Sequence, residues 1–383
     1  MKSYGNLYEK VCSRETIEIA FNDAVRGKTK KSKRRIAAWC KKHKEQVINK
    51  TMHQLETETY SFRQHRPCII YDHKSRKKRS IITPDLNNEE IIHHVIIQVL
   101  KPIIMKGMDS NCCASVPRRG CCYGKKKVEK FIKKYPKDCK YCLKLDIRHF
   151  FPSIDHDRLK VFIKKKIRDR KMQRLIFTVI DNYESESNKG LPLGYYTSQW
   201  LANWYLESLD HYIRERLKAK FYIRYMDDIV IFDSNKRRLH SIKIEIEEYM
   251  NHKLGLKLNN KWQVFRFDYE YINRKGQKIQ GGIFLDFMGF RFYRNRTTLR
   301  RIIMLSLTRK AKKIIKNKVT WYAATQMMSY LGWVKNTNTY NVYETYVKGM
   351  INVKSLRKSI SDKQRRVNNE HYMEVRRKYR KAG

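Results

Sequence analysis

Apolar and polar residues alternate over residues 143–147, a pattern that predicts a half-buried β-strand. Successive side chains of a strand point to opposite faces, so Asp146 shares its polar face with Lys144 and Arg148. The sequence therefore predicts a carboxylate on the exposed face of a buried strand.

Two apolar runs, residues 221–225 and 229–232, flank a short polar segment and predict a β-hairpin with Asp227 and Asp228 at its tip. Adjacent carboxylates repel each other unless a divalent cation neutralises them. A lone Asp-Asp pair is more often a solvated turn, and the third carboxylate, Asp146, favours a metal site. Three carboxylates on neighbouring strands can hold two Mg²⁺ ions, with Mn²⁺ as a substitute, for in-line nucleotidyl transfer.

Helical periodicity predicts three helices around these strands. One helix covers residues 88–101, a second follows Asp155 as N-cap, and a third opens at Ser198. The second helix carries its apolar residues on one face, namely Leu159, Phe162, Ile163 and Ile167. The third helix has apolar residues four apart, a stripe predicted to be core, which comprises Leu201, Tyr205, Leu209, Ile213 and Leu217.

A strand pair is predicted nearer the N-terminus. Residues 68–71 and 80–82 are its two short strands, and residues 74–79 form a basic turn between them. The turn is either a solvated loop or a site for an anion.

The net charge of the chain indicates what kind of molecule it binds. The 85 Lys and Arg residues exceed the 37 Asp and Glu residues, which gives a formal net charge of +48. Such an excess spread over the whole chain favours a polyanion, and nucleic acid is the usual one. The chain has no run of about 18 apolar residues and no apolar signal segment, so we expect no membrane partner.

Composition predicts one assembly of subdomains. Hydrophobic residues make up 41% of the chain, which suffices for a sizeable core. No low-complexity linker or internal repeat is visible.

The nine cysteines favour a reducing compartment, because an odd number without a secretory signal makes a disulfide framework a poor explanation. Zinc is the alternative for the pairs Cys112-Cys113 and Cys121-Cys122 and for Cys139 with Cys142. The spacing of these cysteines departs from that of usual zinc ligands, so buried thiols are the default.

Five segments resemble motifs of reverse transcriptases, in the same order. They are Asp146 with residues 150–155 (motif A), residues 190–194 with 197–199 (motif B), residues 225–228 (motif C), residues 254–258 with Lys261 (motif D), and residues 287–290 (primer grip). The resemblance covers nearly the whole chain.

This resemblance implies a mixed α/β right-hand polymerase that acts as an RNA-directed DNA polymerase. In family terms, residues 1–65 are a basic helical N-terminal extension and residues 66–136 are the fingers. Residues 137–291 are the palm, an antiparallel sheet backed by helices, and residues 292–383 are a basic helical thumb and tail. The implied partners are template RNA, a DNA primer and dNTPs.

The resemblance also implies roles in catalysis. Asp146 and Asp227 would bridge two metal ions, Asp228 would be a second-line ligand, and the carbonyl of Ile147 would complete a coordination sphere. Lys261, or less favourably Lys257, would act as general acid toward pyrophosphate.

Other residues are implied to bind the nucleotide and the template-primer. Arg79 and Lys78 would meet the triphosphate, and Phe151 would be a steric gate against ribose, whereas Phe150 would be core. In the family, the turn of Arg118, Arg119 and Gly120 touches the template, and Phe287, Met288 and Gly289 form the primer grip.

Motif B separates lineages within the family. Leu193 stands before Gly194, and Ser198-Gln199 follows, where most reverse transcriptases have Gln and Ser-Pro. Leu193, Gly194 and Gln199 are expected in the nucleotide pocket. Leu193 cannot form hydrogen bonds there, and each lost bond is worth roughly 0.5–1.5 kcal/mol of discrimination.

The Leu-Gly-x-x-x-Ser-Gln pattern of residues 193–199 resembles reverse transcriptases of diversity-generating retroelements, which copy a template RNA with errors at adenines. The implied task is mutagenic retrohoming, with a small basic accessory protein and a structured RNA as partners. The location that this resemblance implies is the cytoplasm of a bacterial cell, beside the nucleoid. The alternatives are a group II-intron-like or defence-associated reverse transcriptase, and a catalytically silent RNA-binding scaffold.

Overall fold

The computed structural model describes residues 3–28, 31–72, 77–183, 188–316, 319–349, 351–363 and 365. The chain forms two compact units. The first comprises Met1–Gly120 with Lys140–Val264, and the second comprises Cys121–Cys139 with Phe265–Gly383. These boundaries follow packing and differ from the subdomain boundaries expected along the sequence, which stay predictions.

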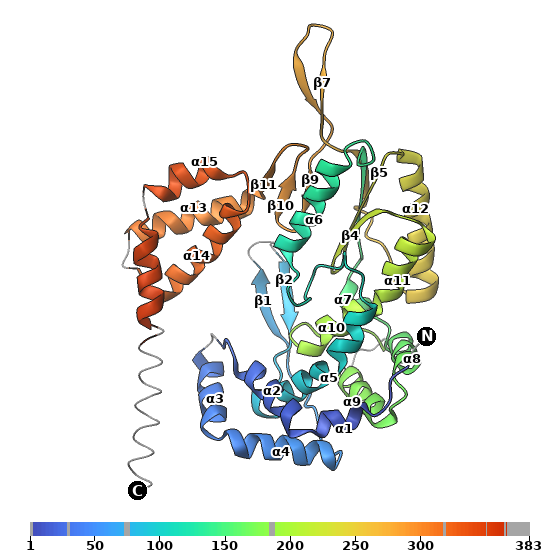
Figure 1. Ribbon diagram of the computed structural model, residues 1–383. Coiled ribbons are helices and arrows are strands. Elements are labelled where there is room, and N and C mark those ends of the chain that lie inside the picture. Colours follow the sequence, from blue (N-terminus) through green and yellow to red (C-terminus); the bar gives the residue numbers. More distant parts are fainter. Residues whose placement is uncertain are drawn as a thin grey trace. The chain divides into compact units, whose positions relative to one another are not determined.

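The N-terminal part of the first unit is helical, as predicted, and its helices gather around α5 (Figure 1). Both α1 and α2 pack directly against α5. The bounds are α1 Leu7–Cys12, α2 Arg14–Val25, α3 Lys31–Lys42, α4 Lys44–Glu56 and α5 Ile91–Gly107.

The predicted end of α5 is wrong. The helix begins with a π-helical turn, η1 (Leu86–Glu90), and runs through Pro102 to Gly107 instead of ending at residue 101. A proline inside a helix costs roughly 3 kcal/mol. Burial of Ile103 and Ile104 beyond the proline offsets that cost.

The predicted strand pair exists, with different bounds. β1 (Cys68–Asp72) pairs antiparallel with β2 (Lys77–Ile81), and Ile70 lies opposite Arg79. Residues 77–79 are therefore strand residues and not part of the basic turn. The remaining turn residues, 73–76, lie outside the described residues.

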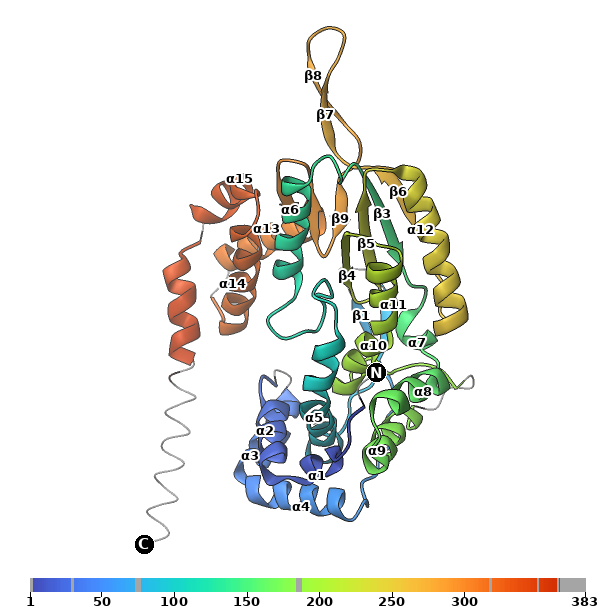
Figure 2. The same cartoon turned by 45° about the vertical axis from the view of Figure 1, so that its right-hand side comes forward.

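The sheet of the first unit has the strand order β4-β5-β3-β6, and β4, β5 and β3 pair antiparallel. Both faces of β4 and β5 are buried, and apart from Arg224 their buried interior residues are hydrophobic or aromatic. The helix α12 packs against β3 and β5 (Figure 2). The bounds are β3 Tyr141–Asp146, β4 Phe221–Tyr225, β5 Asp228–Asp233, β6 Gln263–Arg266 and α12 Lys236–Tyr249, which continues into η3 Met250–Leu254.

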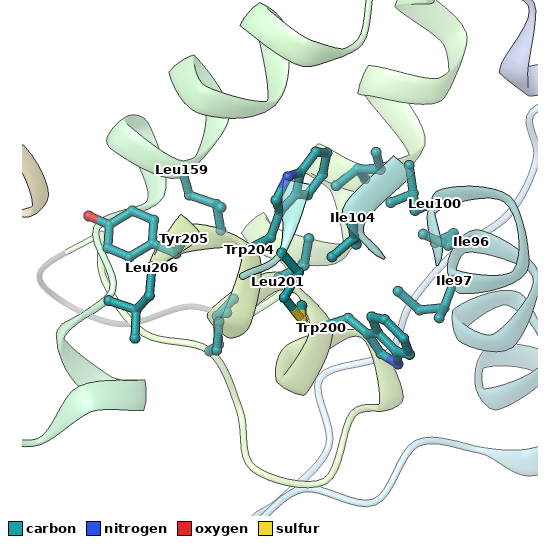
Figure 3. Close-up of a cluster of buried hydrophobic side chains, with 14 of the residues drawn as sticks. Ile96, Ile97, Leu100, Ile104, Leu159, Trp200, Leu201, Trp204, Tyr205 and Leu206 are labelled. Atoms are coloured by element: carbon teal, nitrogen blue, oxygen red, sulfur yellow. The ribbon is translucent and has the colours of Figure 1, made fainter. Parts of the chain in front are cut away.

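Helices α7 to α11 complete the first unit, and the predicted core stripe that starts at Leu201 is buried. Leu201, Tyr205, Leu209 and Ile213 are at most 2% exposed. Figure 3 shows side chains of α10 packed against those of α5. The bounds are α7 Phe150–Ser153, α8 His156–Lys166, α9 Arg170–Asp181, α10 Tyr196–Tyr205, α11 Glu207–His211 and η2 Tyr212–Arg216.

The two N-cap predictions for these helices had different outcomes. The carboxylate of Asp155 accepts a hydrogen bond from the backbone N–H of Arg158, which confirms it as the N-cap of α8. In contrast, α10 begins at Tyr196, and Ser198 lies buried within its first turn. The prediction that Ser198 opens the helix is therefore wrong by two residues.

The second unit combines a small sheet, a hairpin and helices. Its sheet has the order β11-β10-β9, and the β7–β8 hairpin extends away from that sheet (Figure 2). No helix of the described residues is long and apolar enough to cross a membrane. The bounds are α6 Cys121–Lys134, β7 Tyr269–Ile272, β8 Lys278–Gly281, β9 Leu285–Phe287, β10 Phe290–Phe292, β11 Thr297–Leu299, α13 Arg301–Lys316, α14 Trp321–Lys335, α15 Tyr340–Tyr343 and η4 Glu344–Lys348.

Candidate active site

The hairpin of β4 and β5 places one carboxylate in a tight turn. Tyr225 pairs with Asp228, so Met226 and Asp227 are the two turn residues. The prediction that Asp228 also lies at the tip is wrong, because Asp228 is the first residue of β5. Met226 has φ 58°, a left-handed conformation that is unusual for a side chain of this kind.

Asp146 ends the neighbouring strand at the same level. Asp146 on β3 is the register partner of Asp228 on β5. The backbone N–H of Ile147 donates to the carbonyl of Asp227 at 3.3 Å. The pairing of β3 with β5 therefore brings together the two chain segments that carry the predicted carboxylates.

Asn259 fixes the orientation of Asp146 and was missed in the sequence. Its side-chain amide donates to Asp146 Oδ2 at 2.7 Å, and its backbone N–H donates to the carbonyl of Asp146 at 2.8 Å. The isolated β-bridge between Ile147 and Leu258 aligns the two segments. The available signal was an amide directly after the alternating residues 254–258.

One cavity of about 520 Å³ brings seven of the predicted site residues together. Its lining includes residues from β2, the end of β3, α7, motif B and the β4–β5 turn. The predicted residues among them are Lys78, Arg79, Asp146, Ile147, Phe151, Leu193 and Asp227.

Electrostatics in this cavity favour a cation. Burial raises the pKa of Asp227, and the charge of Asp146 raises it further, while Arg79 and Arg224 act in the opposite direction. Within the described part of the chain, no three His, Cys, Asp or Glu side chains gather as a metal-binding group. The carboxylates that line the cavity are Asp146 and Asp227. Mg²⁺ commonly binds one or two carboxylates together with substrate phosphates, so this pair fits Mg²⁺.

The basic side of the cavity is attached to motif B. Lys78 and Arg79 lie on β2 and line the cavity. Directly after this strand, the backbone N–H of Ile82 donates to the carbonyl of Leu193 at 2.8 Å. This bond joins the strand with the cations to the loop with Leu193, so both can contact one bound nucleotide.

Gly194 lies where the segment after β2 meets the loop with Leu193, and its lack of a side chain matters there. Its φ is +120°, and a Cβ atom there would lie 1.9 Å from the carbonyl oxygen of Ile82. The residue therefore allows the close approach of two segments. Neither Gly194 nor the exposed Gln199 lines the cavity, so their nucleotide contacts stay predictions.

The two phenylalanines of motif A differ as expected. Phe150 is 2% exposed and belongs to the core. Phe151 is partly exposed, lines the cavity, and packs edge-on against Phe150 with ring centroids 5.5 Å apart. Phe151 is thus the ring that a bound sugar can meet, and its role as steric gate stays a prediction.

The other predicted residues of the first unit lie outside the cavity. Lys261 is exposed, and only its backbone N–H is held, by the side chain of Asn259 at 3.2 Å. Arg119 donates to the carbonyls of Asp109 and Cys112, which stabilises its own loop. Arg118 is exposed with φ 61°, next to Gly120.

The predicted primer grip belongs to the second unit. Met288 and Gly289 have φ 52° and 87° and form a two-residue turn between β9 and β10. Phe287 is 1% exposed and Met288 is 7% exposed. Trp333 lies against Phe290 and close to Gly289, so the turn rests on α14.

The nine cysteines form no disulfide in the described part of the chain. Cys112, Cys113, Cys139 and Cys142 are buried. Burial raises the pKa of the Cys112 thiol to about 11, which keeps it protonated at neutral pH.

Comparison with known proteins supports the resemblance to reverse transcriptases. A model of the family described as reverse transcriptase (RNA-dependent DNA polymerase) matches residues 74–334. That match covers more than half of the chain, including both carboxylates of the cavity.

Three curated relatives align with part of the chain. The group II intron-encoded protein LtrA of Lactococcus lactis is 28% identical over 183 residues, which are 46% of this chain and 30% of LtrA. An uncharacterized 91 kDa protein in the cob intron of Schizosaccharomyces pombe is 29% identical over 181 residues, 46% of this chain and 22% of that protein. The retron Ec73 reverse transcriptase of Escherichia coli is 32% identical over 110 residues, 25% of this chain and 34% of that protein. The chain thus spans about a third or less of the length of these relatives.

Among solved structures, the telomerase of Candida tropicalis in complex with a TWJ fragment of telomeric RNA has a TM-score of 0.46. Its sequence identity is 13%, over 87% of this chain and 58% of that one. The corresponding Candida albicans complex has a TM-score of 0.43 at 12% identity, over 78% and 58%. Likeness at this level supports no inference about function.

Proposed function

Because the chain belongs to the reverse transcriptase (RNA-dependent DNA polymerase) family, we propose that it copies an RNA template into DNA. The observation that carries this proposal is the meeting of Asp146 and Asp227 with Arg79 and Phe151 on one cavity. That set provides carboxylates for metal ions, a cation for a triphosphate, and a ring beside the sugar. The proposed partners are template RNA, a DNA primer and dNTPs.

Asp146 and Asp227, together with the carbonyl of Ile147, would hold two Mg²⁺ ions, or Mn²⁺ in their place, with Asp228 as a supporting ligand. Bound Mg²⁺ lowers the pKa of a primer 3′-hydroxyl and stabilises the charge that develops on pyrophosphate. Asn259 keeps the carboxylate of Asp146 in one orientation through its hydrogen bond.

Other side chains bind the nucleotide, select the sugar, donate a proton and contact the template-primer. Arg79 and Lys78 bind the triphosphate by charge-assisted hydrogen bonds. Phe151 excludes a ribose 2′-hydroxyl because its ring occupies that space. Lys261 donates a proton to the pyrophosphate leaving group. Arg118, Arg119 and Gly120 contact the template, and the turn at Phe287, Met288 and Gly289 contacts the primer.

Primer extension tests this function. Purified protein is incubated with an RNA template, an annealed DNA primer and dNTPs, in Mg²⁺ or in EDTA. We expect extension that requires the divalent cation. Absence of extension in both Mg²⁺ and Mn²⁺ would contradict the proposal.

Within this activity, we propose that the copying is error-prone at template adenines, as in diversity-generating retroelements. The support is Leu193, an apolar side chain in the cavity lining where most of the family has Gln. A structured template RNA and a small basic accessory protein would then be further partners. Near-identical repeats that differ at adenines, in the DNA beside the gene, would accompany this function.

A group II-intron-like reverse transcriptase is the second candidate. Its support is the 28% identity with LtrA over 183 residues. This candidate needs no excess of errors at adenine and no neighbouring repeats.

Sequencing of cDNA from one defined template separates the two candidates. We expect misincorporation opposite adenine to exceed that opposite the other three bases, and Leu193→Gln to narrow the gap by supplying an amide. Errors spread evenly over the four bases would remove the retroelement assignment and leave the polymerase assignment intact.

A further inference from the structure

A fully buried ion pair lies behind the β4–β5 turn. The side chains of Arg224, on β4, and Asp210, on α11, are both 0% exposed. Arg224 Nε and Nη2 donate to the two carboxylate oxygens of Asp210, each at 2.6 Å. This bidentate contact fixes the plane of the guanidinium.

The third nitrogen of Arg224 reaches the turn itself. Nη1 donates to the carbonyl oxygen of Met226 at 3.0 Å and to Asn203 Oδ1 at 3.1 Å. The amide nitrogen of Asn203 in turn donates to the carbonyl of Ala114 at 2.9 Å. The carbonyl that precedes Asp227 is thus tied to α10 and α11 through one guanidinium.

General stability is a poor explanation for this arrangement. A buried ion pair can often be replaced by apolar residues of similar volume without loss of stability. The strand is also held independently of this side chain, because the backbone N–H of Arg224 donates to the carbonyl of Asn111 and its carbonyl accepts from the N–H of Cys113, both on one neighbouring segment. The side chain of Arg224 is therefore free to serve another purpose than strand pairing.

The conformation of the β4–β5 turn indicates what the side chain of Arg224 does. Met226 adopts φ 58°, and such a conformation persists only where surrounding contacts determine it. We propose that Arg224 is a positioning residue: with Asp210 and Asn203 it holds the Met226 carbonyl, and thereby keeps Asp227 directed toward Asp146. This inference rests on the proposed polymerase function. It adds that buried residues behind the turn hold the catalytic carboxylate in place.

Only arginine fits this role. Its planar fork donates from three nitrogens in fixed directions, and here it contacts Asp210, Asn203 and Met226. Lysine keeps the charge beside Asp210 but has one nitrogen, which cannot reach all three acceptors in this geometry.

Tyr222 offers a matched control from the same cluster. Its hydroxyl donates to Asp210 but makes no contact with the turn among the described hydrogen bonds. Tyr222→Phe removes one buried bond of the network and leaves the link between Arg224 and Met226 in place. It is also a suitable parent for changes at Asp210, because no buried hydroxyl then loses its partner.

The experiment uses the full chain in four forms: wild type, Tyr222→Phe, Arg224→Lys, and Tyr222→Phe with Asp210→Leu and Arg224→Met. Thermal melting, the Kd for an RNA–DNA template-primer, kcat and the KM for dNTP are measured for each form. A primer ending in a dideoxynucleotide gives a further readout without chemistry, namely the Mg²⁺ concentration at which half of the ternary complex with the next dNTP forms.

We expect Tyr222→Phe to match wild type within twofold in every kinetic value. Both Arg224 variants should melt cooperatively and bind the template-primer within twofold of wild type. Their kcat should fall at least 30-fold, with little change in the KM for dNTP. The half-saturating Mg²⁺ concentration should rise at least fivefold.

A folded Arg224 variant with wild-type kcat and wild-type Mg²⁺ dependence would overturn the inference. Failure of both Arg224 variants to fold would also overturn it, since the pair would then be needed for the fold itself. Absence of primer extension by the wild type contradicts the proposed function instead, and the ternary-complex assay still reports on Arg224.

Discussion

Asn259 bonds to Asp146 twice, from its side-chain amide to Oδ2 at 2.7 Å and from its backbone N–H to the carbonyl at 2.8 Å. The two residues are 113 positions apart in the chain. The carboxylate is thereby held in one orientation before any metal ion or substrate binds.

Removal of the amide should therefore weaken catalysis without unfolding the protein. We expect Asn259→Ala to lower kcat by roughly 10- to 100-fold, the usual effect of losing a residue that orients a metal ligand. The neighbouring Asn260 is exposed and provides the control. Steady-state primer extension by Asn259→Ala and Asn260→Ala measures the difference, and equal rates in the two variants would remove this role from Asn259.

Gly194 should be intolerant of any side chain. A Cβ atom would lie 1.9 Å from the Ile82 carbonyl oxygen in a backbone with φ +120°. We expect Gly194→Ala to lower the free energy of unfolding by about 3 kcal/mol or more. Gly332 in α14 has no atom within 4 Å of such a Cβ, so Gly332→Ala should be neutral or stabilising by up to about 1 kcal/mol.

Urea unfolding of the two alanine variants measures both values. The close approach of Gly194 to Ile82 has no energetic importance if Gly194→Ala unfolds within about 0.5 kcal/mol of wild type.

Asp227 should destabilise the metal-free protein at neutral pH. Burial and the charge of Asp146 raise its pKa, so the folded state binds the proton more tightly than the unfolded state. Ionisation above that pKa therefore costs stability, and protonation at low pH restores it. Without divalent cations, Asp227→Asn should raise the melting temperature at pH 7 by about 2 °C or more.

The pH dependence of the melting temperature tests whether the charge of Asp227 causes this difference. The difference between Asp227→Asn and wild type should shrink as pH falls through the raised pKa of Asp227 and vanish below about 3.9, the ordinary Asp pKa, where the folded and unfolded states are both protonated. Added Mg²⁺ should stabilise wild type more than the variant. A variant that melts below wild type at pH 7 without metal would show that the carboxylate is already neutralised within the protein.

Phe151 should decide the choice of sugar. Both phenylalanines of motif A line the cavity, but the ring of Phe151 is partly exposed whereas that of Phe150 is buried. We expect Phe151→Ala to incorporate ribonucleotides at least tenfold more readily relative to dNTPs, because the obstruction is steric. Competition between rNTPs and dNTPs during extension measures this ratio, and an unchanged ratio would locate the gate elsewhere.

The sequence was informative where the chemistry depends on local periodicity. Alternation over residues 143–147 and the two apolar runs around Asp227 define a sheet whose pairing brings Asp146 opposite Asp228. The stripe of Leu201 and Leu209 was core for the same reason. Such patterns report the buried face of one element and need no knowledge of its partners.

Features that depend on distant partners were missed. Asn259 and Arg224 act through contacts with Asp146 and Asp210, and no local pattern marks either pair. The helix α5 continues through Pro102 because tertiary burial outweighs a local breaker. The bounds of β2 follow from its pairing with Cys68–Asp72 and not from its own composition.

The central claim is that the protein synthesises DNA on an RNA template and that Asp146 and Asp227 are both required for this reaction. Primer extension by Asp146→Asn and Asp227→Asn tests that claim most directly. Asparagine keeps the shape of each side chain and removes its charge. The account predicts that each variant binds the RNA template-primer within twofold of wild type and extends it in Mg²⁺ roughly 1,000-fold or more slowly. Extension by Asp227→Asn at the wild-type rate would contradict it.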